Sequence, residues 1–198
     1  RNCDWSSDVC SSDLLGALSS GILLYGCSLI YGFSGSINFE EIQYNLFLVD
    51  KLNLGLIFGL VFILAGLAFK VSAVPFHMWT PDVYTGAPTP VTGFLSAAAK
   101  AAGFAVFLRV LLTGIPLESE NWKNLLWILA VLTMTVGNLM ALRQNSVKRM
   151  LAYSSIAHAG YVMVAAVAGS AEALSGIFFY SCAYALMGTG AFGILTIR

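Results

Sequence analysis

The stretch Lys70–Val91 has the sequence KVSAVPFHMWTPDVYTGAPTPV and carries four of the five prolines of the chain: Pro75, Pro81, Pro88 and Pro90. Each proline lacks a backbone N–H donor and disturbs the helical turn before it. We therefore expect a helix that breaks near Pro75, a short helical piece near 81–85 and a new helix that starts at Pro90. The pairs Thr80-Pro81 and Thr89-Pro90 have the pattern of a threonine N-cap followed by a proline in the first turn.

The chain around this stretch is strongly apolar. Of its 198 residues, 58% are hydrophobic and only 10% are charged, and the mean hydropathy is +0.81. Soluble domains carry about 25% charged residues, so the composition argues against a soluble domain. A bilayer core needs about 20 apolar residues per helix. Six segments qualify: 14–33, 54–74, 90–114, 122–142, 150–169 and 173–196. This pattern predicts an all-α polytopic protein of the lipid bilayer.

Charge and motifs exclude several classes of function. Ten Lys and Arg balance ten Asp and Glu, whereas a nucleic-acid partner would require a basic excess. The four cysteines form no C-x-x-C pair, and the chain has neither a dinucleotide fingerprint nor a P-loop. We therefore expect no nucleic-acid partner, no cofactor and no metal site in this chain.

The distribution of lysine and arginine predicts the orientation in the membrane. The loop 143–149 contains Arg143, Lys148 and Arg149 and no acidic residue. The positive-inside rule places such a loop in the cytoplasm. Alternation of the spans then places the loops 34–53 and 115–121 on the opposite side.

The predicted break has two interpretations. Broken backbone at membrane depth is tolerated where it is buried in protein or lines a wet cavity, and interrupted helices form ion sites in transporters. On this interpretation His77 and Asp82 are candidate cavity residues beside the four prolines. The alternative is an ordinary cytoplasmic loop, in which Asp82 only caps a short helix.

Two lysines lie inside predicted spans, Lys70 near the end of the second and Lys100 near the middle of the third. A central charge costs about 2.5–3.5 kcal/mol. Lys100 is at least about 15 Å of helix from the ends of its span, too far to reach water. Burial disfavours the charged form of a lysine, which permits proton exchange near neutral pH. We expect Lys100 to be functional, whereas Lys70 could also extend to the aqueous phase. Small residues on the helical face of Lys100 predict close packing: Gly93, Ser96, Ala97 and Gly103.

The fifth span carries a polar stripe at helical spacing, formed by Ser154, Ser155, His158 and Tyr161. Such a stripe within a membrane can support a chain of hydrogen-bonded waters, with His158 as a proton relay. The same groups could instead hydrogen-bond to a neighbouring helix and only hold it in place.

The first thirteen residues, RNCDWSSDVCSSD, have neither a helical nor a strand period, and they repeat Ser-Ser-Asp. Cys10–Leu14 also corresponds to a translated sequencing-adapter string. We therefore expect residues 1–13 to be a non-native tail and residues 14–198 to be a membrane domain truncated at both ends.

Three stretches together resemble one family. Lys70–Val91, the run FLSAAAK at 94–100 and the run YSSIAHAGY at 153–161 are similar to subunit N of NADH-quinone oxidoreductase (respiratory complex I), a family of antiporter-like, proton-translocating membrane subunits. The resemblance covers about 14–198. Stand-alone cation/proton antiporters share a looser version of the first stretch but usually lack its Pro-Asp-Val-Tyr.

The resemblance implies a bundle of about fourteen helices with two inverted repeats, each carrying a broken helix. Lys70 then corresponds to the lysine of the first broken helix and Lys100 to the lysine of the next helix, both as proton relays. The glutamate that pairs with the first lysine, and the lysine of the second broken helix, have no counterpart in this chain, so we expect that it cannot pump alone.

The implied setting is a translocase in the bacterial inner membrane, with other membrane subunits of the oxidoreductase as partners. Electron transfer from NADH to quinone would take place in those partners, so the quinone acts on the complex rather than on this chain. Two alternatives remain, a stand-alone cation/proton antiporter and a structural membrane subunit with inert lysines.

Overall fold

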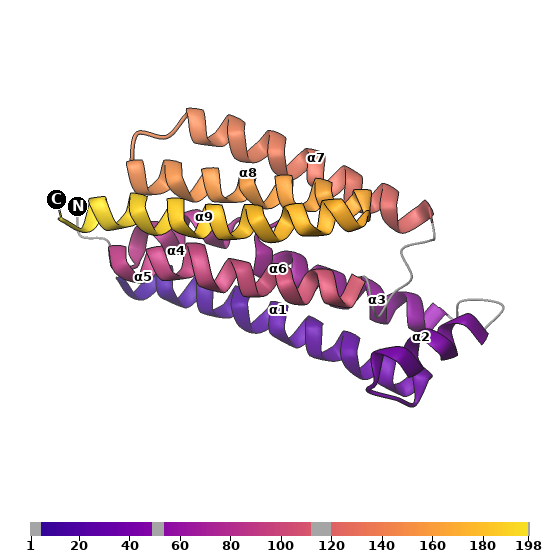
Figure 1. The fold of residues 1–198 in the computed structure, drawn as a ribbon. Coiled ribbons are helices and arrows are strands. Elements are labelled where there is room, and N and C mark those ends of the chain that lie inside the picture. The colour runs from indigo at the N-terminus through magenta and orange to yellow at the C-terminus, as the bar shows by residue number, and fades with distance from the viewer. Residues whose placement is uncertain (1–4, 49–53, 112–119, 198) are drawn as a thin grey trace.

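A computed structural model of the chain describes residues 5–48, 54–111 and 120–197, and every regular element within these ranges is a helix. The long helices lie side by side as an elongated bundle, with the first and the last described residues of the chain at the same end (Figure 1). Six helical segments are long and apolar enough to cross a membrane: 14–34, 54–71, 89–109, 123–142, 147–168 and 172–197. The prediction of an all-α fold with six spans is confirmed.

Two pairs of helices form the sides of the bundle. Helix α1 (Trp5–Ser34) packs along α3 (Leu54–Val71), and α7 (Glu120–Leu142) packs along α8 (Val147–Ala168). The second pair approaches closely at Gly137, where a Cβ atom would lie 2.7 Å from the backbone nitrogen of Ala157. Small residues are therefore required at this crossing, as in many membrane helix pairs.

The helix break lies where the prolines predict it. Helix α3 ends at Val71, and the chain makes turns before α4 (Trp79–Gly86) and α5 (Thr89–Phe94). The Val74–Pro75 peptide bond is cis. The hydroxyl groups of Ser72 and Thr80 are 2.6 Å apart, and the Val74 N–H donates to Thr133 Oγ1 at 3.0 Å. Side chains therefore take over hydrogen bonds at the break that a continuous helix would make internally.

The predicted threonine caps are wrong. The N-cap of α4 is Met78 and that of α5 is Pro88, and neither makes a side-chain capping bond. Both helices begin earlier than the threonine–proline pattern indicates. Because Thr80 lies inside α4, its hydroxyl pairs with Ser72 instead.

The third span is not a regular helix. It consists of α5, the π-helix η1 (Leu95–Ala99) and α6 (Lys100–Arg109). A π turn changes the angular phase of the residues around it, so the predicted small-residue face of Lys100 is divided. Gly93 and Ser96 meet α9 (Ala171–Ile197), Gly103 meets Val71 of α3, and only Ala97 stays beside Lys100 in one cavity.

Two segments without helical signals in the sequence are helical in the structure. Residues 5–13 form the first turns of α1, and the predicted loop 34–53 contains α2 (Phe39–Leu48). Extending an existing helix adds one hydrogen bond per residue and needs no hydrophobic period, which explains the first case. The suggestion that 1–13 is non-native stays a prediction. Residues 112–119, which include most of the predicted loop 115–121, lie outside the described residues.

Candidate functional site

Lys100 is buried inside the bundle and held by α8. Its side chain is 4% exposed. Its Nζ atom donates to Ser155 Oγ at 2.7 Å and to the backbone oxygen of Ser155 at 3.1 Å. The Ser155 hydroxyl in turn donates to the backbone oxygen of Ala152 at 2.9 Å. Within the described part of the chain no acidic side chain pairs with Lys100, so its hydrogen bonds to neutral oxygen atoms compensate part of the loss of water.

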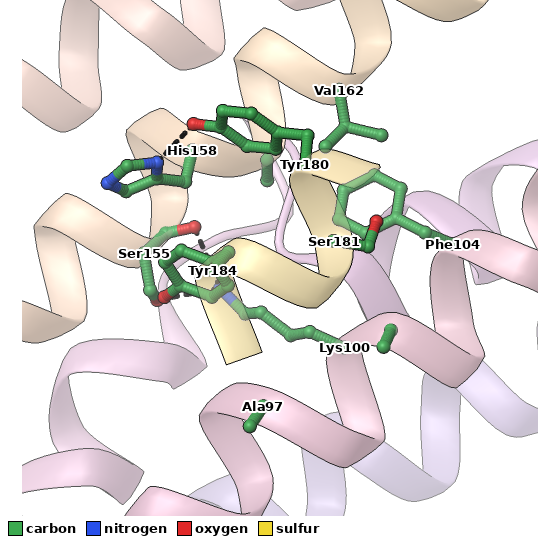
Figure 2. A pocket seen from close by; sticks show the side chains of 11 residues that line it. Ala97, Lys100, Phe104, Ser155, His158, Val162, Tyr180, Ser181 and Tyr184 are labelled. Atoms are coloured by element: carbon green, nitrogen blue, oxygen red, sulfur yellow. Dashed lines mark hydrogen bonds between the residues drawn. The ribbon is translucent and has the colours of Figure 1, made fainter. Parts of the chain in front are cut away.

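A small cavity of about 20 Å³ lies beside the Lys100 ammonium group. This volume holds about one water molecule. The polar residues that line the cavity come from α6, α8 and α9: Lys100, Ser155, His158, Tyr180, Ser181 and Tyr184. Figure 2 shows Lys100 extending from its helix toward Ser155, with Tyr184 beside them and Tyr180 beside His158.

His158 is surrounded by aromatic rings. Its Nδ1 atom is hydrogen-bonded to Tyr180 Oη. The ring centroids of Tyr184 and Tyr161 lie 4.7 Å and 5.5 Å from the imidazole. The structure thus brings together the predicted relay residues Lys100 and His158 around one cavity, both within the membrane-spanning part of the bundle.

The polar stripe of the fifth span serves two neighbours rather than one. Ser155 and His158 face the cavity. The Tyr161 hydroxyl instead accepts a hydrogen bond from Asn138 Nδ2 of α7 at 3.3 Å. The link between two helices is therefore observed at Tyr161, whereas the role of Ser155 and His158 in a chain of waters stays a prediction.

Lys70 lies apart from this cavity. It is exposed in the last turn of α3, and among the described residues it makes no hydrogen bond or ion pair. The structure does not bring Lys70 and Lys100 together in one site. The relay role of Lys70 therefore depends on the family resemblance alone.

The residues of the break also lie outside the cavity of Lys100. Pro81 is buried, Pro88 and Pro90 are exposed, and Pro75 lines a separate apolar cavity of about 200 Å³ between α1 and α3. Asp82 is exposed and pairs with Arg149 at 3.1 Å. Partial burial lowers the pKa of His77, whose Nδ1 has no partner among the described residues.

Tyrosines are the part of the site that the sequence patterns did not indicate. Tyr180 and Tyr184 line the cavity from α9. The ring of Tyr84, fully buried on α4, has its centroid 5.8 Å from Lys100 Nζ. The available signal was the spacing of Tyr180 and Tyr184, which are four residues apart in an apolar span and therefore share one helical face.

The fold and this site define a class, a polytopic helical membrane protein with a lysine buried among polar groups inside its bundle. Residues 10–197 match the family described as NADH:quinone oxidoreductase/Mrp antiporter, transmembrane. The chain belongs to this family.

Individual relatives agree with this assignment. The chain is 55% identical over 185 residues to NADH-quinone oxidoreductase subunit N from Trichlorobacter lovleyi, a match that covers 93% of the chain and 38% of that relative. Respiratory complex I from Thermus thermophilus contains a chain that is 41% identical, with a TM-score of 0.76 and coverage of 92% and 38%. A chain of an archaeal membrane-bound sulfane sulfur reductase is 32% identical, with a TM-score of 0.82 and coverage of 93% and 39%. The chain spans about 38% of the length of the curated relatives it matches.

Proposed function

We propose that this chain is part of a membrane subunit of a proton-translocating NADH:quinone oxidoreductase, and that Lys100 relays protons within it. One observation supports the relay above all. Lys100 is 4% exposed in the membrane-spanning part of the bundle, and its hydrogen bonds go to neutral oxygen atoms of Ser155. Because no described carboxylate fixes its charge, the ammonium group can release a proton without breaking an ion pair.

The chemistry of the relay follows from the contacts of Lys100. When Nζ is charged, Ser155 Oγ accepts a hydrogen bond from it and donates its own proton to Ala152 O. After Nζ has lost a proton, its lone pair can accept a hydrogen bond from the same serine hydroxyl, because hydroxyl groups rotate freely. Both states of Lys100 therefore have a partner. The adjoining cavity, which has room for about one water, supplies a path for the released proton.

His158 is the second relay group in this proposal. It lies across the same cavity, and an imidazole can take up and release protons near neutral pH. Lys70 is the third, on the resemblance to the family, with its partner on a part of the bundle beyond this chain. The oxidation of NADH and the reduction of quinone belong to other subunits, which are the partners of this one in the bacterial inner membrane.

The source of energy for proton movement, NADH oxidation or a sodium gradient, distinguishes the proposal from a stand-alone antiporter. In membranes that contain the full-length subunit, NADH should drive proton uptake into inverted vesicles, and quinone-site inhibitors should stop it. Lys100→Ala should abolish this uptake, whereas Lys123→Ala, at an exposed lysine near the start of α7, should leave it unchanged. Proton movement that responds to a sodium gradient and not to NADH would contradict the proposal and favour an antiporter. Normal NADH-driven uptake in Lys100→Ala would contradict the relay.

A further inference from the structure

Two tyrosines of α9 belong to the wall of the cavity that contains Lys100 and His158. Tyr180 and Tyr184 are one helical turn apart, and both line the cavity beside Lys100 and His158. They contribute hydroxyl groups to a helix that is otherwise apolar over most of its length. A tyrosine hydroxyl can donate and accept at the same time, so it can pass a proton on without acquiring a net charge.

Tyr184 lies between His158 and the serine that holds Lys100. Its ring centroid is 4.7 Å from that of His158, and its hydroxyl faces the Ser155 side chain. Ser155 Oγ is itself 2.7 Å from Lys100 Nζ. Lys100, Ser155 and Tyr184 thus lie next to one another although they come from three helices (Figure 2).

Tyr180 completes the series at the histidine. Its Oη atom is hydrogen-bonded to Nδ1 of His158. A neutral imidazole has one nitrogen that accepts and one that donates, so the Tyr180 hydroxyl can donate its proton to Nδ1. Both tyrosines line the same cavity of about 20 Å³, which has room for about one water.

We propose that Tyr184 and Tyr180 are relay residues that carry protons between Lys100 and His158. This inference depends on the proposed function and adds to it the groups that bridge its two titratable ends. In one transfer, an N–H bond of the Lys100 ammonium breaks and Ser155 Oγ takes the proton while releasing its own to Tyr184. Tyr184 passes its phenolic proton to the cavity water, the water passes one to Tyr180, and Tyr180 donates its proton to His158 Nδ1. Each hydroxyl gains one proton and loses one, so only Lys100 and His158 change charge.

The test removes single hydroxyl groups and keeps the rings. Tyr184→Phe and Tyr180→Phe are introduced into the full-length subunit within the assembled complex. Tyr161→Phe is the matched control, because its ring contacts the same histidine while its hydroxyl pairs with Asn138 of α7 and Tyr161 does not line the cavity. We expect each of the first two changes to lower NADH-driven proton uptake about tenfold or more, with normal assembly, and the control to pump normally.

A second measurement separates proton transfer from packing. Replacing Tyr184 by 3,5-difluorotyrosine keeps the ring and the hydroxyl but makes the hydroxyl more acidic. A relay hydroxyl should then change the pH dependence of proton uptake, whereas the same replacement at Tyr161 should leave the pH profile unchanged. A Tyr184 that only fills space would give the same pH profile with either residue.

The outcomes also separate this inference from the proposed function. Normal pumping in Tyr184→Phe and Tyr180→Phe, together with loss of pumping in Lys100→Ala, overturns the tyrosine bridge alone. Normal pumping in Lys100→Ala overturns the proposed function, and the bridge with it. Equal loss of assembly in all three phenylalanine variants, with an unchanged pH profile for difluorotyrosine, also overturns the bridge, because it assigns the hydroxyls a structural role.

Discussion

Replacing Lys100 by methionine tests whether its buried charge is needed for proton transfer or for the stability of the fold. Methionine keeps an unbranched apolar side chain but removes the ammonium group and its two hydrogen bonds to Ser155. Hydrogen bonds from a charged donor contribute about 1.5–3 kcal/mol each, whereas the desolvation of an ammonium ion costs several kcal/mol. The two terms largely cancel. We therefore expect Lys100→Met to change the free energy of unfolding by no more than about 2 kcal/mol and the complex to assemble.

Lys100→Arg is the complementary change. Arginine keeps the positive charge but does not lose its proton in a protein, and the extra atoms of its guanidinium group can occupy the adjoining cavity. We expect both variants to assemble and both to lose proton uptake about tenfold or more. Assembly is measured by native gel electrophoresis, and proton uptake by the quenching of a pH-sensitive dye in inverted membranes supplied with NADH.

Each variant can refute a different step of this reasoning. Near-normal proton uptake in Lys100→Arg would show that a fixed charge is sufficient and would end the relay hypothesis. Failure of Lys100→Met to assemble, together with assembly of Lys100→Arg, would show that the charge holds the fold together. Lys123→Met serves as the control for a lysine that is exposed.

Three further predictions concern the fold around the site. Ser146→Cys should react with a membrane-impermeant thiol reagent only in inverted vesicles and Asn38→Cys only in intact cells, because the basic loop is expected in the cytoplasm; the reverse pattern would overturn the orientation. Gly137→Ala should destabilise the subunit by about 1–3 kcal/mol, since its Cβ would lie 2.7 Å from Ala157 N. Gly176→Ala is the control, because its Cβ meets no atom within 4 Å; equal thermal stability of the two variants would contradict the close approach. Asp82→Asn should cost less than about 1 kcal/mol, because the side chains of the Asp82–Arg149 pair are 59% and 44% exposed; a large fall in thermal stability would show that the pair has a larger structural role.

The sequence was informative where one residue type has one strong physical effect. Apolar length predicted the six spans, because each helix must cross the same bilayer core. The cluster of prolines predicted the break, which lies between Val71 and Trp79 as expected. The central position of Lys100 in its span predicted burial, since a lysine there has no route to water.

The sequence was less informative where the outcome depends on neighbouring helices. The fixed angular step of an α-helix predicted that Gly93, Ser96 and Gly103 share a face with Lys100. Because η1 changes the phase, Gly93 and Ser96 meet α9 while Gly103 meets α3. Tyr180 and Tyr184 contribute to the site because α9 lies against the cavity, and a single sequence does not give that arrangement. Lys70 could not be assigned a partner within this chain for the same reason.

The direction of Lys100 depends on whether the five residues before it, Leu95–Ala99, form a π-helix or an α-helix. A π turn accommodates one more residue than the α turn it replaces. Removing one of the three alanines at 97–99 would therefore leave a regular helix whose flanking faces keep their directions, with the lysine still toward Ser155. Rewinding the same five residues as α-helix, with none removed, would instead turn the lysine about 100° around the helix axis. The span would keep its composition and hydropathy, while its single buried ammonium group would face a different neighbour.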